Sequence, residues 1–539
     1  MTAPTTSGSE HYDVVVVGAG IAGITAACYL GRSGIRTLLL EKEDKPGGLV
    51  GSFIHEGFTF DSGIRAFENS GIVYPMLRDL GIDIHACKST VSVGIASHMV
   101  KITVQEDIGS YADMLSAVFP TERDSIAAIA SDISRTMDYM DVLYGIDNPL
   151  FSDSLNDPRY LMKILLPWFI RYSRNIKKIK KMNAPVNDYL SIFTENLSLI
   201  DMITQHFFKK TPAFFALSYF GMYLDYSYPQ GGTGTLIDKM IHYSMEKGVV
   251  VKTGSEVTEV YHQDKLVRLK DGNSFSYDKL IWAADNKAFY RSLHTNSLDN
   301  PETDGKIKEQ IRSSQFAKGA ESILSLYIGT DLSPEYFCDR CGEHAFYTPS
   351  AEGLSSIGGS PVIPDDDYVK RYLELTTYEI SIPVLRDHTL APGGCTGLIV
   401  STLFDYDLAK AYAVCGRYTE LKDLCARTVL NILEKSVFPG STGKVRFVLT
   451  STPLTIERIT GNSSGAITGW SFDSDMIPAV SDITKIASSV KTPVADIFQA
   501  GQWAYSPAGL PTAIMTGKLA ANAATGKSTY TAMGNRRKT

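Results

Sequence analysis

The sequence has few cysteines, and they are not arranged to crosslink a fold. There are seven in 539 residues, an odd number. The single C-x-x-C pair, Cys338 and Cys341, lacks a second pair or histidines at ligand spacing. We therefore expect no disulfide framework and no bound metal. The cysteine usage indicates a reducing, cytoplasmic location, and a redox-active or purely structural role for the C-x-x-C pair stays open.

Motifs of several common protein classes are also missing. The sequence contains no G-x-x-x-x-G-K-[ST] phosphate loop and no H-E-x-x-H zinc helix. Basic residues are outnumbered, with 52 Lys and Arg against 59 Asp and Glu and a net charge of −7. A protein whose main partner is a nucleic-acid backbone is therefore not expected.

The N-terminus does not have the composition of a targeting segment. Its first ten residues, MTAPTTSGSE, are polar, whereas a signal peptide needs a basic start and an apolar core. The uncharged stretch 14–31 is nearly long enough to cross a bilayer, but its glycines follow the spacing of a soluble strand–helix unit. No transmembrane helix is expected.

The strongest pattern in the sequence is a strand–helix–strand unit near its start. Residues 14–17 form an apolar β-branched run, G-A-G-I-A-G follows at 18–23, and a second apolar run at 37–40 leads to Glu41. In such a unit the three glycines allow a tight turn, the close approach of a pyrophosphate, and the packing of helix on strand. The helix N-terminus offers N–H groups and a positive dipole to phosphates. The unit predicts a dinucleotide-binding site.

The position of Glu41 narrows the choice of dinucleotide. It lies 18 residues after Gly23, close to the roughly 20 expected for the acid that binds a ribose hydroxyl. An acid here repels a 2′-phosphate, so the ligand is FAD or NAD rather than NADP. The predicted contacts within this unit are Gly18, Gly20, Ile21, Ala22, Gly23 and Glu41.

The sequence that follows resembles a group of flavoproteins. It runs EKEDKPGGLVGSFIHEGFTFDSG, an acid–lysine pair followed by Pro-Gly-Gly, a nearby serine and Gly-aromatic-Thr-Phe-Asp-x-Gly. This pattern is similar to the FAD-dependent superfamily of phytoene desaturases, carotenoid isomerases and retinol saturases, with flavin amine oxidases as more distant relatives. The resemblance implies FAD as the cofactor and places Lys42, Gly48, Leu49 and Ser52 among its contacts.

Three later segments resemble the same superfamily in the same order. They are YPQGGTGT at 228–235, SIPVLRDHTLAPGG at 381–394 and FQAGQWAYSPAGLPTAIMTGKLAANA at 498–523. The matches therefore span nearly the whole chain. They are specific for the superfamily and do not select one reaction within it.

The last of these segments also has a physical interpretation. Gly501 makes a turn after an apolar strand, and Gly509-Leu510-Pro511 precedes an alanine-rich helix. The N–H groups at its start would stabilise negative charge on a reduced flavin, although a simple packing helix is the alternative. The resemblance places this helix against the isoalloxazine. It implies Gly501, Gly509 and Leu510 as contacts, with Trp503 and Tyr505 either near the ring or in the core.

The middle of the chain predicts a nucleotide-binding region that is not continuous. Residues 248–260 and 266–285 form short predicted strands around a D-G hairpin. In the superfamily the nucleotide domain resumes here, and the residue matching Val257 holds the adenine through its backbone. We predict an α/β fold: a Rossmann-like FAD-binding domain from 10–85, 225–290 and 440–535, and a mixed α+β substrate domain from 86–224 and 291–439.

Positive charge is concentrated in residues 160–182. The segment reads YLMKILLPWFIRYSRNIKKIKKM, with seven Lys or Arg and no acid, and its apolar residues recur at near-helical spacing. Two interpretations stay open. Either the helix lies on an anionic membrane surface, or its apolar face packs on its own protein. The apolar residues are Leu165, Trp168, Phe169, Tyr172, Ile176 and Ile179.

The resemblance implies an FAD-dependent oxidoreductase that desaturates or isomerises carbon–carbon bonds of an apolar polyene or isoprenoid, carotenoid- or retinoid-like. The aromatic residues of 204–224 fit either a core or an apolar substrate tunnel. A second Rossmann fingerprint for NAD(P)H is missing, so a saturase would need an external electron donor. A flavin amine oxidase and a non-catalytic flavin-binding protein are the alternatives, and the sequence assigns no catalytic acid or base.

Overall fold

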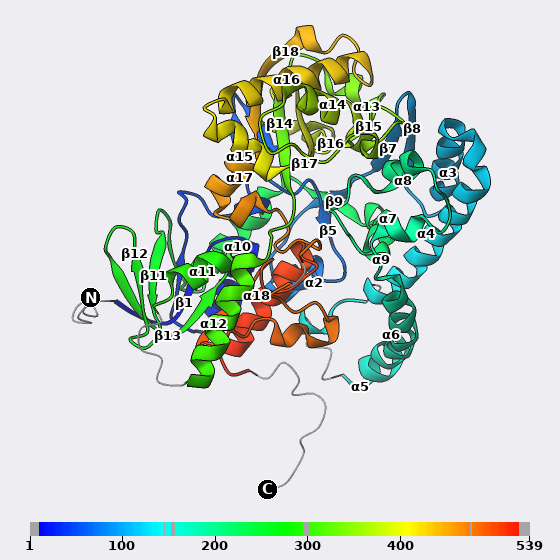
Figure 1. The fold of residues 1–539 in the computed structure, drawn as a ribbon. Helices are drawn as coiled ribbons and strands as arrows, with labels where there is room; N and C mark the ends of the chain where they lie inside the picture. Colours follow the sequence, from blue (N-terminus) through cyan, green and yellow to red (C-terminus); the bar gives the residue numbers. More distant parts are fainter. Residues whose placement is uncertain (1–9, 145, 152–156, 295–300, 475–476, 528–539) are drawn as a thin grey trace.

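The computed structural model describes residues 10–144, 146–151, 157–294, 301–474 and 477–527 (Figure 1). Within these ranges the chain forms two seven-stranded sheets, two smaller sheets and the helices around them. The α/β class expected from the sequence, with a Rossmann-like sheet and a mixed second region, is confirmed.

The first sheet combines strands from both ends of the chain. Its central strand, β1 (Glu10–Val17), has an apolar end that is buried on both faces, as is typical of a parallel sheet. Two strands, β12 (Leu266–Leu269) and β11 (Val257–Tyr261), form an antiparallel edge. The parallel strands are β10 (Val250–Lys252), β2 (Thr37–Leu40), β1, β13 (Ser274–Trp282) and β19 (Ile497–Gln499).

The carboxyl ends of these parallel strands meet at one edge of the sheet. Val17 pairs with both Leu40 and Trp282, and Trp282 pairs with Gln499. Ligands of open α/β sheets bind outside this edge. The fold therefore places a ligand site where β1 turns into the helix that follows it.

Two helices pack closely on this sheet. Helix α1 (Ile21–Arg32) follows β1, and α18 (Leu510–Ala524) follows β19. A Cβ atom added to Gly517 would lie 2.3 Å from the carbonyl oxygen of Ala22, so the two backbones approach to a distance that only glycine permits. This contact packs α1, from the N-terminal part of the chain, directly against α18, from the C-terminal part.

The second sheet is mixed and lies at the top of Figure 1 beneath several helices. Its apolar side chains form a core with those helices. In order, its strands are β18 (Val445–Ser451), β14 (Ser322–Thr330), β17 (Thr396–Phe404), β16 (Tyr378–Ser381), β15 (His344–Thr348), β7 (Val91–Ile95) and β8 (His98–Ile102). The covering helices are α13 (Pro334–Cys338), α14 (Asp366–Leu375), α15 (Tyr406–Val414) and α16 (Tyr418–Lys435).

Strand β18 differs from the expected domain division. Residues from 440 onward were expected in the nucleotide-binding part, yet β18 pairs with β14 at the edge of the second sheet. Its side chains pack beside Phe58 and Phe60, with Phe447 in edge-to-face contact with both rings. These pairings place the strand with the second sheet, and the division of the chain into two domains remains our proposal.

A helical layer on the right of Figure 1 completes the molecule. A three-stranded sheet joins it to the rest: β9 (Tyr226–Pro229) pairs with β5 (Phe67–Glu68) and β6 (Ala86–Lys88). The helices are α3 (Asp107–Val118), α4 (Arg123–Tyr144), α6 (Leu166–Ile179), α7 (Val186–Leu190), α8 (Leu197–Thr204) and α9 (Ala213–Tyr223).

Candidate active site

One large cavity begins at the carboxyl edge of the first sheet and reaches the second sheet. Its volume is about 1070 Å³, at the upper end of the range for small-molecule and cofactor sites. All but one of the predicted cofactor-binding residues line it. These are Gly18, Gly20, Ile21, Ala22, Glu41, Lys42, Gly48, Leu49, Ser52, Val257, Gly501, Gly509 and Leu510.

The glycines of the fingerprint have different roles. A Cβ on Gly20 would meet no atom within 4 Å, because this residue faces the open cavity. A Cβ on Gly23, the one predicted contact outside the cavity lining, would lie 2.0 Å from the carbonyl oxygen of Gly18. Gly20 therefore leaves room for a ligand, while Gly23 lets the helix pack on the strand. A bound pyrophosphate requires both features: an open approach at one glycine and close helix–strand packing at the other.

Helices α1 and α18 both begin at the cavity. Their N-caps, Gly20 and Gly509, supply no side-chain hydrogen bond to the first turn. The N–H groups of both first turns and the positive ends of both helix dipoles are thus directed at a ligand. The start of α1 fits a diphosphate, and the start of α18 fits a ring carbonyl that becomes negative on reduction.

Glu41 is held in place by the backbone. The N–H of Ala19 donates to its Oε2 at 2.8 Å, and the N–H of Glu43 donates to its Oε1 at 3.0 Å. Each carboxylate oxygen keeps capacity for another donor. We propose that Glu41 accepts hydrogen bonds from ribose hydroxyls, as its position in the sequence suggested. Lys42 is engaged elsewhere, donating to the carbonyl of Arg458 at 2.9 Å.

Asp61, the acid of the Gly-aromatic-Thr-Phe-Asp motif, is a buried hub that was not singled out from the sequence. Its carboxylate accepts hydrogen bonds from the hydroxyls of Ser52 and Tyr228, and from both the N–H and the hydroxyl of Thr233. Ser52 also accepts from the N–H of Gly234 at 2.9 Å. The two motifs that resembled the superfamily, 41–63 and 228–235, are therefore joined through one carboxylate.

The two aromatic residues considered near the flavin ring occupy different places. Trp503 lines the cavity, and its indole N–H donates to Asn462 at 3.2 Å. Tyr505 is buried in the core of the first sheet and is not part of the cavity lining. Of the two, only Trp503 is positioned to contact a ligand.

The half of the cavity away from the fingerprint is largely aromatic. Phe207, Phe208, Phe215 and Tyr219 come from the aromatic stretch 204–224, and Phe346 comes from β15. Other residues of the same stretch, such as Phe220, pack in the core instead. The stretch therefore serves both as core and as cavity wall.

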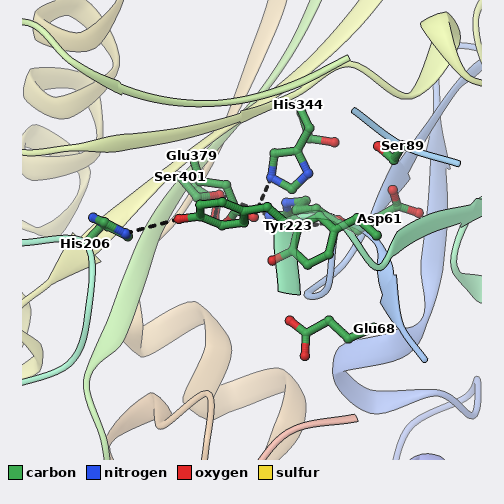
Figure 2. Close-up of polar contacts among 12 residues, drawn as sticks. Asp61, Glu68, Ser89, His206, Tyr223, His344, Glu379 and Ser401 are labelled. Carbon is green, nitrogen blue, oxygen red and sulfur yellow. Dashed lines mark hydrogen bonds and ion pairs between the residues drawn. The ribbon is translucent and has the colours of Figure 1, made fainter. Parts of the chain in front are cut away.

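A buried hydrogen bond between two side chains interrupts this aromatic wall (Figure 2). Glu379 of β16 accepts a hydrogen bond from Nε2 of His344 at 3.0 Å. Burial alone would raise the pKa of Glu379, but the contact with His344 and the positive charges of Arg65 and Arg386 outweigh it and lower the pKa. Burial also lowers the pKa of His344. At neutral pH the wall thus carries an ionised Glu379 beside a neutral imidazole.

Glu68 is a second carboxyl group in the cavity wall. It lies deep in the protein, yet its side chain keeps accessible surface, which faces the cavity. The hydroxyl of Tyr219 donates to its Oε1 at 3.0 Å, and this hydroxyl also contacts that of Tyr226 at 3.1 Å. Burial raises the pKa of Glu68 to about 7, because the site disfavours the charged form. Glu68 therefore titrates near neutral pH, whereas Glu379 is ionised there.

Comparison with known proteins identifies the family. A sequence model described as "Flavin containing amine oxidoreductase" matches residues 21–331, more than half of the chain. The chain belongs to this family. FAD is its cofactor, as expected from the sequence, and the protein is an FAD-dependent oxidoreductase.

Individual relatives support the expected superfamily. The chain is 24% identical to prolycopene isomerase of Daucus carota, over 85% of this chain and 72% of the relative. It is 23% identical to carotenoid 3,4-desaturase of Haloarcula japonica, over 79% of this chain and 83% of the relative. A solved structure of a putrescine oxidase variant covers 96% of this chain at a TM-score of 0.62 and 14% identity, and all of that chain is matched.

Glu68, His344 and Glu379 are the cavity residues that the sequence did not point to. They lie on three strands, β5, β15 and β16, with no fixed spacing between them. The only signal for Glu68 was its place five residues after the Asp-x-Gly motif. The cysteines of the C-x-x-C pair do not form a disulfide in the structure: Cys338 is exposed, Cys341 is buried, and both are free thiols.

We predict that Gly20→Val abolishes FAD binding without unfolding the protein. The backbone of Gly20 has φ −76°, which valine adopts, and its added side chain would occupy the space of the pyrophosphate. Purified variant should show folded far-ultraviolet circular dichroism but no flavin absorbance. Gly109→Val is the matched control, because Gly109 is exposed on α3 with nothing within 4 Å of its added Cβ. A yellow, fully loaded Gly20→Val protein would contradict the site.

Proposed function

We propose that this oxidoreductase acts on carbon–carbon bonds of a carotenoid- or retinoid-like polyene, by desaturation or cis–trans isomerisation. The observation that carries the proposal is the aromatic-walled half of the cavity, which is continuous with the predicted nucleotide site. The names of its relatives, a prolycopene isomerase and a carotenoid 3,4-desaturase, support the same substrate class. Bound FAD supplies hydride transfer to or from carbon.

The residues of the chain itself hold and orient such a substrate. The flat side chains of Phe207, Phe215 and Phe346 offer ring faces and edges to a conjugated chain and exclude water from it. Trp503 and the start of α18 bound the cavity on the side of the predicted flavin ring. A polyene lying between these groups would be close to the cofactor along part of its length.

The charge of the wall argues against an amine substrate. Binding an ammonium group needs uncompensated negative charge or an open aromatic cage. Here Arg65 and Arg386 lie near Glu379 and lower its pKa, and Glu68 is neutral below a pH of about 7. The positive groups offset the ionised carboxylate, so the wall does not attract a cation.

We further propose that the helix of residues 160–182 rests on an anionic membrane surface. Most of its predicted apolar face packs on the protein: Ile179 is buried, and the indole N–H of Trp168 donates to the carbonyl of Val142 in α4. A second apolar face points outward, where Met162 is 65% and Phe169 57% exposed. Leu166 and Ile170, also exposed, lie on the same face.

Basic residues flank this exposed apolar face. Arg171, Arg174, Lys180 and Lys181 are all exposed, and an apolar stripe beside lysine and arginine is the composition of an interfacial helix. Among the described residues, no helix has the length and apolar content to cross a bilayer. An apolar substrate dissolved in lipid would then be reached from the membrane surface.

We predict that anaerobic incubation with a candidate polyene yields a product whose mass identifies the reaction. Desaturation should give a product two hydrogens lighter, formed only by oxidised enzyme. Isomerisation should give an unchanged mass with a new double-bond geometry, formed only by chemically reduced enzyme. Mass spectrometry with chromatography of the isomers makes the measurement. Peroxide released from a polyamine, with no turnover of any polyene, would instead assign the protein to the amine oxidases.

We predict that neutralising the basic residues of the helix weakens its binding to anionic vesicles. At about 1 kcal/mol for each basic residue near the surface, four changes to Gln should reduce partitioning about a thousandfold at low salt. Vesicle sedimentation at rising salt tests this for the variant with Arg171, Arg174, Lys180 and Lys181 changed.

A matched control changes four exposed lysines elsewhere, Lys270, Lys370, Lys410 and Lys491, to Gln. Equal loss of binding in both variants would mean that only net charge matters. Phe169→Ser should weaken binding at all salt concentrations, because it removes apolar contact rather than charge.

A further inference from the structure

We propose that Glu68 is the catalytic residue that exchanges a proton with the substrate. The proposal rests on the polyene chemistry proposed above and adds an acid–base group to it. Glu68 does not belong to a sequence motif of the nucleotide site.

The position of Glu68 supports a direct contact with substrate. Glu68 lies on β5, and this strand packs against α18, whose first residues line the predicted flavin end of the cavity. The residue is partly buried and lines the cavity. A substrate between the aromatic wall and α18 would therefore pass in front of Glu68.

Glu68 is also held by its neighbours in one orientation. The hydroxyl of Tyr219 donates to Oε1, and a hydrogen bond with the Tyr226 hydroxyl favours the ionised form as well. Tyr219 is fixed in turn by Tyr226 and by the edge-to-face contact with Phe207. The two tyrosine hydroxyls thus hold the carboxyl group at the cavity wall, where a substrate hydrogen can reach it.

The carboxyl groups of Glu68 and Glu379 have different pKa values, as do the paired carboxyl groups of carboxylate enzymes in which one serves as the acid. Glu379 is ionised through His344, Arg65 and Arg386. Glu68 has only neutral tyrosine hydroxyls as hydrogen-bond partners, and it titrates near neutrality. A group that gains and loses a proton close to the working pH is suited to acid–base catalysis.

The proton balance holds for both reactions. In desaturation two C–H bonds on adjacent carbons break: one hydrogen would leave as hydride to bound oxidised FAD, and the other leaves as a proton to the Glu68 carboxylate, its bonding pair forming the new π bond. In isomerisation the Glu68 acid protonates one carbon of a double bond, the resulting delocalised cation rotates about the former double bond, and a proton from the same carbon returns to Glu68.

The pH dependence follows from the groups around Glu68. The groups that act on Glu68 are Tyr219 from α9, Asp225 and Tyr226 at β9, and Glu379 from β16. Glu379 in turn has Arg65 and His344 beside it. The tyrosine pKa values are raised well above their usual value of 10, so these hydroxyls do not titrate near neutrality. Above a pH of about 7 Glu68 is a carboxylate, and the desaturation rate should rise through this value.

The test is single-turnover reduction of bound flavin by the polyene that the mass experiment identifies, measured across pH. Glu68→Gln should slow this step 100-fold or more, the usual contribution of a general acid or base, and remove the rise near pH 7. Flavin content and visible spectrum should be unchanged. For an isomerase the same variant should lose conversion, and wild-type enzyme in D₂O should incorporate deuterium at the isomerised bond.

Two further variants test whether the pH dependence comes from Glu68. Tyr219→Phe removes a donor that favours ionised Glu68, so the midpoint of the pH profile should move upward while FAD stays bound. Glu195→Gln, on the surface, is the matched control and should behave as wild type. A Glu68→Gln enzyme within threefold of the wild-type rate, with the same pH profile, would overturn the proposal.

A measurement without substrate separates this proposal from the proposed function. Native Glu68 binds its proton more tightly than the unfolded chain does, so wild-type stability should fall relative to Glu68→Gln as pH rises from the unfolded pKa of 4.5 to about 7. Melting temperatures of the two holoenzymes across this range test it. A constant difference overturns the assignment of Glu68. The expected trend without turnover of any polyene overturns the proposed function, and with it the catalytic role.

Discussion

The arrangement of this protein depends on the burial of one carboxylate, that of Asp61. It is fully enclosed, and a charged group in such a place is tolerated only when donors surround it. Ser52, Tyr228 and Thr233 provide those donors. Because they come from segments about 170 residues apart, satisfying the carboxylate also fixes the hairpin of β3 (Ser52–His55) and β4 (Phe58–Asp61) against the start of α10 (Gly234–Glu246). Removing any donor would leave a buried charge short of a partner.

Around this hub the cavity acquires two chemically different ends. At the first sheet, glycines and helix N-termini present backbone N–H groups, which suit phosphates and a ring carbonyl. At the second sheet, aromatic rings alternate with a few buried polar groups, and Arg65 lies where the two ends meet, bonded to the carbonyl of Asp61 and to Ser401. Arg65 thus has two roles: its hydrogen bonds join the two parts of the structure, and its positive charge lowers the pKa of Glu379.

Local spacing allowed the nucleotide end to be predicted, because the fingerprint encodes its own geometry within one strand–helix–strand unit. Apart from Gly23, the predicted contacts of that unit and the start of α18 line a common cavity. The chemistry of the other end could not be predicted in this way. Glu68 and Glu379 acquire their properties from burial and from neighbours on other strands, and neither effect leaves a periodic pattern in the sequence.

The same distinction applies to single elements. Helical spacing placed Trp168, Phe169 and Ile179 on one apolar face. In the structure Trp168 and Ile179 pack on the protein, but Phe169 is exposed beside Met162, because the face that the protein covers depends on contact with α4. Strand β18 likewise joins the second sheet through pairing with β14. The sequence of β18 does not by itself predict which strand it pairs with.

The use of both chain ends in one sheet has a consequence for synthesis in the cell. Gly20 and Gly501 line the same cavity, yet the ribosome makes them about 480 residues apart, an interval on the order of half a minute or more at ~5–20 residues per second. During that time α1 lacks its partner α18, and its small apolar face is uncovered. The cavity that the two segments share is therefore complete only after α18 has been synthesised.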